Sequence, residues 1–143
     1  AHEFPGRCCV LPNAAARVSF VRHAGDLYHE VTEVVLASIA SVPERFIFES
    51  PKSIPVETLL DLSSGPVHGV QVWPAGVALA DFLLGGGGPL ITGDRVHEIG
   101  CGWALPAIAA AQLGADHVVA SDLPDVIAAL QLALPQGLPL ELE

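Results

Sequence analysis

A regular alternation of short strands and helices over the last third of the chain constrains the fold more than any other sequence feature. Apolar runs at residues 95–99, 117–121 and 138–142 predict strands, and segments rich in alanine and leucine at 105–113 and 124–134 predict helices. Strands that alternate with helices across short connections form parallel sheets with crossover helices. We therefore expect an α/β fold with a doubly wound parallel sheet.

The residues before this region carry weaker signals. Residues 1–23 show no clear periodicity, and we expect an extended arm. Apolar residues at helical spacing predict a helix over 26–43, with Asp26 as its N-cap. A short strand is expected at 45–49 and a β-hairpin within 56–72. A further helix then begins at Trp73-Pro74, because proline is tolerated in a first turn.

Composition and charge exclude several functional classes. With 143 residues, the chain has the length of one domain, and 51% hydrophobic residues exclude a disordered chain. The formal net charge is −10, and no cluster of Lys and Arg is available to neutralise the phosphates of a nucleic acid. The apolar surplus predicts a covered sheet or an interface with other protein subunits, and the acidic balance suits a basic partner. No run of eighteen apolar residues predicts a transmembrane span.

The cysteines and the amino-terminal residues give the only information on compartment. The three cysteines have no CxxC spacing and no disulfide framework, so a reduced intracellular compartment is expected. Arg7, Arg17 and Arg22 leave two alternatives open, the remnant of an organelle-targeting peptide or an ordinary solvated tail.

A glycine loop follows the first strand of the alternating region. The strand ends at Glu98, Gly100 and Gly102 follow, and the next helix begins at Leu105. Glycines at such a turn let the backbone approach a ligand, and the N–H groups of the helix point at its polar end. The alternative is a tight strand-to-helix turn without a ligand.

An acidic residue, Asp122, follows the next strand. In doubly wound sheets ligands bind beyond the carboxyl ends of the strands, where an acid can hydrogen-bond ribose hydroxyls; the alternative role is an N-cap. The dinucleotide motif GxGxxG is not met, because Leu105 stands in the place of its third glycine. The carboxylate of Glu98 would repel a pyrophosphate and attract the cationic end of S-adenosylmethionine. S-adenosylmethionine is therefore the expected cofactor.

Four segments, taken in order, resemble the seven-strand protein-lysine methyltransferases of the class I S-adenosylmethionine-dependent group. They are VWPAGVALA at 72–80, EIGCG at 98–102, LPAIAA at 105–110 and ASDLP at 120–124. The resemblance covers residues 65–135, about half of the chain, and the combination of the segments makes it specific.

The resemblance implies a Rossmann-like fold of which the chain holds the amino-terminal half. Residues 24–143 would form an incomplete methyltransferase-like domain, with a helix and hairpin over 24–72 and the cofactor-binding half over 73–143. The residues implied to contact the cofactor are Trp73, Glu98, Gly100, Gly102 and Asp122. For Trp73 a core aromatic at a strand–helix corner remains the alternative.

The sequence departs from the family in several places. The family has a small flexible pair where this chain has Trp103-Ala104; the ring would fill the adenosine pocket, and an alanine adopts a positive φ only with strain. His97 is polar at a normally apolar strand position. The string His97-Glu98 does not continue to the second histidine of a zinc motif, so no metal site is expected. The chain stops at Glu143, before the family's catalytic half, and no catalytic residue can be named.

Two functions follow from these observations. The substituted loop, the stop after the third strand and the apolar composition favour a non-catalytic structural subunit of a larger protein assembly that retains a degenerate S-adenosylmethionine site. The alternative is an active protein-lysine N-methyltransferase of which this chain is a fragment.

Overall fold

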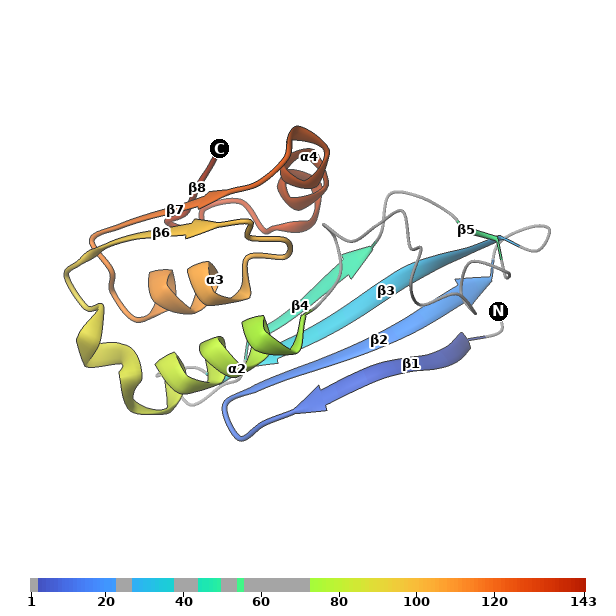
Figure 1. Ribbon diagram of the computed structural model, residues 1–143, viewed down its shortest axis with the longest axis horizontal. Helices are drawn as coiled ribbons and strands as arrows, with labels where there is room; N and C mark the ends of the chain where they lie inside the picture. Colours follow the sequence, from blue (N-terminus) through green and yellow to red (C-terminus); the bar gives the residue numbers. More distant parts are fainter. Residues whose placement is uncertain (1–2, 23–26, 38–43, 50–53, 56–72) are drawn as a thin grey trace.

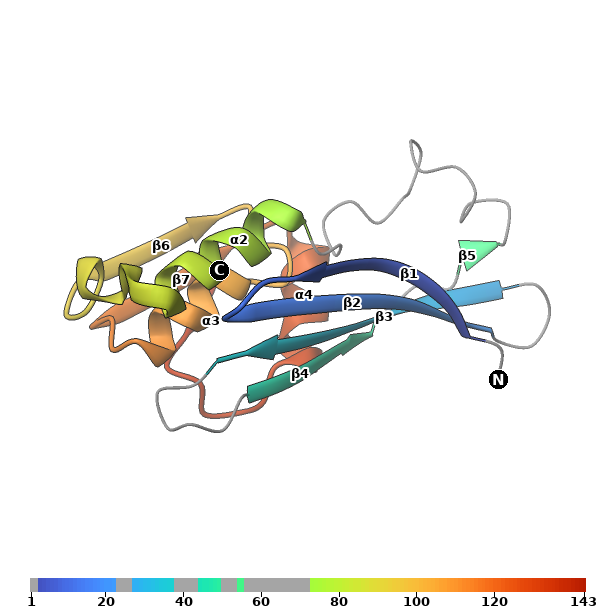
Figure 2. The same ribbon diagram turned by 90° about the horizontal axis from the view of Figure 1, so that it is seen from below.

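The computed structural model describes residues 3–22, 27–37, 44–49, 54–55 and 73–143. Two sheets face one another with helices packed between them, as Figure 1 and the perpendicular view in Figure 2 show. The structure is mixed α/β, as expected.

The predicted alternation over the last third of the chain is confirmed. The strands are β6 (Arg95–Ile99), β7 (His117–Ser121) and β8 (Glu141–Leu142), and they pair in the order β6-β7-β8 with both pairs parallel. The crossover helices are α3 (Leu105–Gln112) and α4 (Pro124–Ala133). Because β6 and β7 are parallel neighbours, their carboxyl ends lie next to each other, and this edge of the sheet carries the candidate site.

Helix α3 lies in the centre of the molecule. Its residues from Leu105 to Ala111 are all buried. On one side it contacts β6 and β7, where Val118 and Ala120 of β7 are buried. An apolar sequence on all sides of a helix is typical of a buried helix, and the alanine-rich α3 meets that condition.

The amino-terminal part forms an antiparallel sheet, which corrects two predictions. Its strands are β1 (Glu3–Val10), β2 (Ala14–Arg22), β3 (Leu27–Leu36), β4 (Glu44–Glu49) and β5 (Ile54–Pro55). They pair in the order β1-β2-β3-β4, with β5 also on β3. The expected extended arm is instead a pair of strands, and the expected helix that followed it is β3. The strand predicted at 45–49 is confirmed, and the division into domains stays a prediction.

The burial pattern of β3 shows why this segment forms a strand where a helix was predicted. Thr32, Val34 and Leu36 are each 0% exposed, whereas the residues between them are partly exposed. This is the period of two of a strand with one covered face. The apolar positions of the segment fit helical spacing as well, and its many β-branched side chains add to the preference for a strand.

The helix expected after Trp73 is α2 (Pro74–Phe82), with proline in its first turn. It continues into a π-helical turn, η2 (Leu83–Gly87), and a short 3-10 turn, η3 (Gly88–Leu90). The α-helix thus ends before the four glycines at 85–88. The hairpin expected within 56–72 lies outside the described residues.

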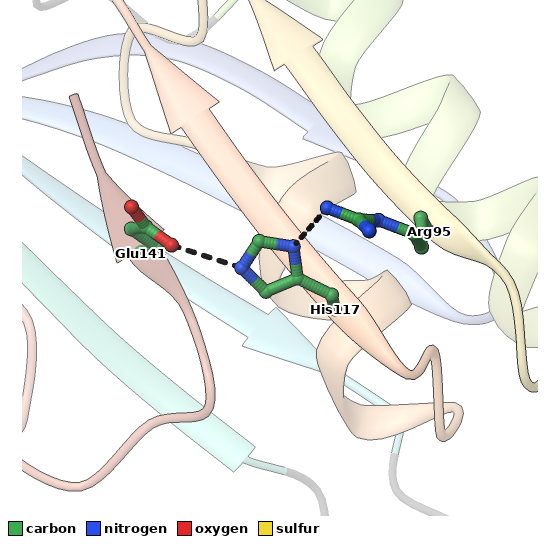
Figure 3. Close-up of polar contacts among 3 residues, drawn as sticks. All are labelled: Arg95, His117 and Glu141. Carbon is green, nitrogen blue, oxygen red and sulfur yellow. Dashed lines mark hydrogen bonds and ion pairs between the residues drawn. The ribbon is translucent and has the colours of Figure 1, made fainter.

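Several polar side chains lie on the outer face of the parallel sheet. His117 Nε2 lies 2.9 Å from a carboxylate oxygen of Glu141, and His117 Nδ1 lies 3.5 Å from an Nη of Arg95 (Figure 3). In the tautomer that carries its proton on Nε2, the ring donates to Glu141 and can accept from the guanidinium of Arg95, which only donates. His97 Nε2 lies 2.8 Å from Ser121 Oγ on the same face. The polar residue at this normally apolar strand position thus pairs with a hydroxyl.

Candidate functional site

The loop between β6 and α3 has an unusual backbone. Three of its residues have a positive φ, 67° at Gly100, 52° at Gly102 and 55° at Ala104. Glycine adopts this left-handed conformation without a steric penalty, whereas a residue with a Cβ pays about 1 kcal/mol or more. Ala104 adopts this conformation with ψ 34°, and the strain expected of an alanine at a positive φ applies to it.

The strain at Ala104 leads to a prediction. Replacing Ala104 with glycine is expected to change the free energy of unfolding by less than about 0.5 kcal/mol, because relief of the left-handed strain offsets the loss of one buried methyl group. The same replacement at Ala110, which is equally buried within α3, should cost about 2 kcal/mol, since there the helix propensity is lost as well. Urea denaturation of both variants measures the difference. Equal losses would show that Ala104 carries no strain.

The loop amides bind to the end of β7. The Gly100 and Cys101 N–H groups both donate to the Ser121 carbonyl, at 2.9 and 3.1 Å, and the Gly102 N–H donates to Asp122 Oδ2 at 2.8 Å. A loop that binds phosphate presents such amides to its ligand. Here these three amides already have protein acceptors, so the loop is poorly suited to a pyrophosphate.

Asp122 organises the site from the end of β7. Besides the Gly102 amide on Oδ2, its Oδ1 accepts the Leu123 N–H at 2.7 Å. An ionised carboxylate has about four acceptor positions, so about two remain for a ligand. The alternative of an N-cap is not what the structure shows, since Leu123 occupies the N-cap position of α4.

Glu98 is held at the start of α3. Its Oε2 accepts the Ala107 N–H at 2.8 Å, and the N-cap residue of that helix, Ala104, makes no side-chain cap of its own. Glu98 therefore satisfies one of the free N–H groups of the helix start. Burial raises the pKa of Glu98 to about 7; the Ala107 hydrogen bond opposes the rise and the charge of Asp122 adds to it.

Cys101 lies in the same loop and is buried. Burial, with smaller contributions from the charges of Glu98 and Asp122, raises its thiol pKa to about 12. Since the thiolate is the nucleophile, Cys101 is an inert thiol in this environment.

The structure brings four of the five predicted site residues together. Glu98, Gly100, Gly102 and Asp122 lie at the carboxyl ends of β6 and β7, within one hydrogen-bonded cluster and its loop. Trp73 lies outside that cluster, at the N-cap of α2, and its 50% exposure corrects the alternative of a core aromatic.

Trp103 is the loop residue whose observed position differs from the one expected from the sequence. It is 2% exposed, and its ring stacks on Phe48 of β4 with centroids 4.7 Å apart and an interplanar angle of 19°. The ring therefore packs against the antiparallel sheet, whereas it was expected to fill the adenosine pocket. No local signal reveals this contact, because Phe48 is far away in the sequence.

The described ranges contain neither a candidate metal site nor a candidate membrane-spanning helix. Among those residues, no group of three His, Cys, Asp or Glu side chains is placed to hold a metal ion. Within the same ranges, none of the helices has the length and apolar character needed to cross a membrane.

A small parallel sheet with crossover helices and a glycine loop between two carboxylates is compatible with a partial Rossmann-like fold. No family model matches the chain. Over 102 residues it is 28% identical to protein N-terminal and lysine N-methyltransferase EFM7 of Candida albicans, covering 71% of this chain and 39% of that protein. Over 54 residues it is 44% identical to the electron transfer flavoprotein beta subunit lysine methyltransferase of Xenopus laevis, covering 38% of this chain and 22% of that protein.

The corresponding Danio rerio lysine methyltransferase is 48% identical over 59 residues, covering 41% of this chain and 22% of that protein. The matched part of the chain thus spans between 22% and 39% of the length of these curated relatives. The names of the relatives support a methyltransferase family for the chain.

Proposed function

We propose that this chain supplies the S-adenosylmethionine-binding part of a protein-lysine N-methyltransferase. The observation that carries the proposal is the loop held between Glu98 and Asp122, whose amides already have protein acceptors. The relatives named as lysine methyltransferases support lysine as the acceptor of the methyl group. The net charge of −10 also suits an acceptor protein that presents lysine.

The donor set of the site fits this cofactor. S-adenosylmethionine carries a sulfonium and an ammonium group, and both are attracted by carboxylates. Asp122 keeps about two free acceptor positions, which suit ribose hydroxyls. Glu98 keeps Oε1 beside the Oε2 that accepts from Ala107, and a cation bound beside it would favour its ionised form.

The part played by this chain would be binding and orientation. The bound cofactor supplies a methyl group on a cationic sulfur, to be transferred to an amine. Such a transfer depends mainly on holding the two reactants in line, which a fixed glycine loop favours. The second candidate, a non-catalytic structural subunit, relied partly on the substituted loop. Trp103 and Ala104 are accommodated within a formed turn, so this argument is weaker.

Calorimetric titration tests the proposal. S-adenosylhomocysteine is expected to bind saturably with one site per chain, whereas NADH, which brings a pyrophosphate, is expected not to bind. Circular dichroism confirms in parallel that the chain is folded. A folded chain that binds neither compound would favour the structural subunit, and a chain that binds NADH would contradict the choice of cofactor.

A further inference from the structure

The candidate site is in direct contact with the antiparallel sheet. Phe48 of β4 is 0% exposed and stacks on Trp103, which lies between Gly102 and Ala104 of the loop. Phe48 belongs to the antiparallel sheet, whereas the loop connects β6 of the parallel sheet to α3. One aromatic contact therefore joins the loop to a strand of the other sheet.

The ring of Trp103 is held by packing. Its indole N–H is buried and has no hydrogen-bond acceptor in the described part of the chain. A buried unpaired N–H costs free energy, so the position of the ring must be stabilised by its contacts. Stacking on Phe48 is a contact of the required kind, because offset aromatic pairs contribute beyond the area that they bury.

The stack of Trp103 on Phe48, here called the anchor, lies next to the strained part of the loop. The residues on either side of Trp103 are Gly102 and Ala104. Both have a left-handed backbone, and at Ala104 this conformation is strained. Strained conformations persist only where the surrounding structure enforces them. The Gly102 amide that binds Asp122 is one peptide away from the anchored ring. The contacts thus run from Phe48 through Trp103 and Gly102 to Asp122.

We infer that the Phe48–Trp103 stack is a positioning device, by which the antiparallel sheet holds the glycine loop in its ligand-binding conformation. The inference rests on the proposed function, since the ligand is the proposed cofactor. Phe48 and Trp103 act through the backbone of the loop. Without the stack, the loop relaxes, and Asp122 loses the Gly102 amide that orients it.

Strand β4 offers a matched pair of variants. Phe46 and Phe48 are both buried on the same face of β4, at 6% and 0% exposure, and their rings stack with centroids 6.2 Å apart. Only Phe48 stacks on Trp103. Phe46→Ala and Phe48→Ala therefore remove the same atoms from the same core, and only Phe48→Ala removes the anchor.

Three measurements on the 143-residue chain separate anchoring from general stability: the midpoint of thermal unfolding, the Kd of S-adenosylhomocysteine, and the exchange rate of the Gly102 amide without ligand. Both alanine variants should lower the midpoint by similar amounts. Phe48→Ala should weaken binding about tenfold or more, a size typical of coupling between sites, and accelerate Gly102 exchange. Phe46→Ala should leave Kd and exchange close to wild type. Trp103→Phe keeps a ring on Phe48 and should retain the affinity.

The outcomes distinguish the inference from the proposed function. If both alanine variants change Kd and Gly102 exchange equally, the stack has no special role and the inference is overturned. If the wild type does not bind but only Phe48→Ala accelerates Gly102 exchange, the anchor stands and the proposed function fails. If Phe48→Ala does not fold, Phe48→Leu retains an apolar side chain without the ring, and unchanged affinity in that variant would overturn the inference.

Discussion

Replacing Glu98 with glutamine is expected to raise the free energy of unfolding at pH 8 by at most about 3 kcal/mol and to change it little at pH 4. Burial is the main cause, because it raises the pKa of this carboxyl from 4.5 to about 7. Between these pH values the folded chain binds more protons than the unfolded chain, so wild-type stability falls as the pH rises. Glutamine carries no charge and still accepts the Ala107 N–H, so this part of the pH dependence disappears.

Urea denaturation of wild type and Glu98→Gln between pH 4 and pH 8 measures this effect. The difference between the two proteins should grow as the pH passes through about 5 to 7, and level off above. Glu49, which is exposed on β4, provides the control, since replacing an exposed carboxylate by glutamine should change the free energy of unfolding little. A Glu98→Gln difference that does not depend on pH would contradict the assignment of the shifted carboxyl.

Replacing Asp122 with alanine is expected to weaken the binding of S-adenosylhomocysteine by at least about tenfold, since hydrogen bonds to a charged group contribute about 1.5–3 kcal/mol each. The variant removes the proposed ribose acceptor and also the acceptor of the Gly102 and Leu123 amides. The loop would then lose its attachment to the end of β7 at Gly102.

Asp125 provides the control for this variant, because it is an exposed acid in the first turn of α4. Asp125→Ala should cost only the weak interaction with the helix dipole, about 0.5 kcal/mol of stability, and leave the affinity unchanged. Calorimetry on both variants makes the comparison. If Asp122→Ala binds as tightly as wild type, Asp122 is not part of the ligand site.

The site could be located from the sequence because its determinants are local. Glu98 ends one strand, Asp122 follows the next, and the helix predicted between the two strands is the crossover that a parallel pair needs. Parallel neighbours bring their carboxyl ends to one edge, and the structure places both acids there. The glycine loop also reads directly from the sequence, because Gly100 and Gly102 supply the left-handed turns.

The remaining features depend on contacts between distant segments. The helix expected over β3 was wrong because its apolar spacing fits two periods, and pairing with β2 and β4 selects the strand. The stack of Trp103 on Phe48 joins the loop before α3 to β4, and these two segments lie far apart in the sequence. The role of Glu98 at the start of α3 follows from the missing side-chain cap at Ala104, and only the folded geometry shows that Glu98 reaches the Ala107 amide.

The central claim is that the loop between Glu98 and Asp122 binds S-adenosylmethionine, and NMR of the isotope-labelled chain tests it most directly. On titration with S-adenosylhomocysteine, we expect saturable chemical-shift changes of the backbone amide signals at residues 100–104 and at Asp122. The amide signals of β1 and β2 should not shift. If the folded chain shows no shifts at these residues, or saturable shifts only elsewhere, the loop is a structural turn and the proposed function is wrong.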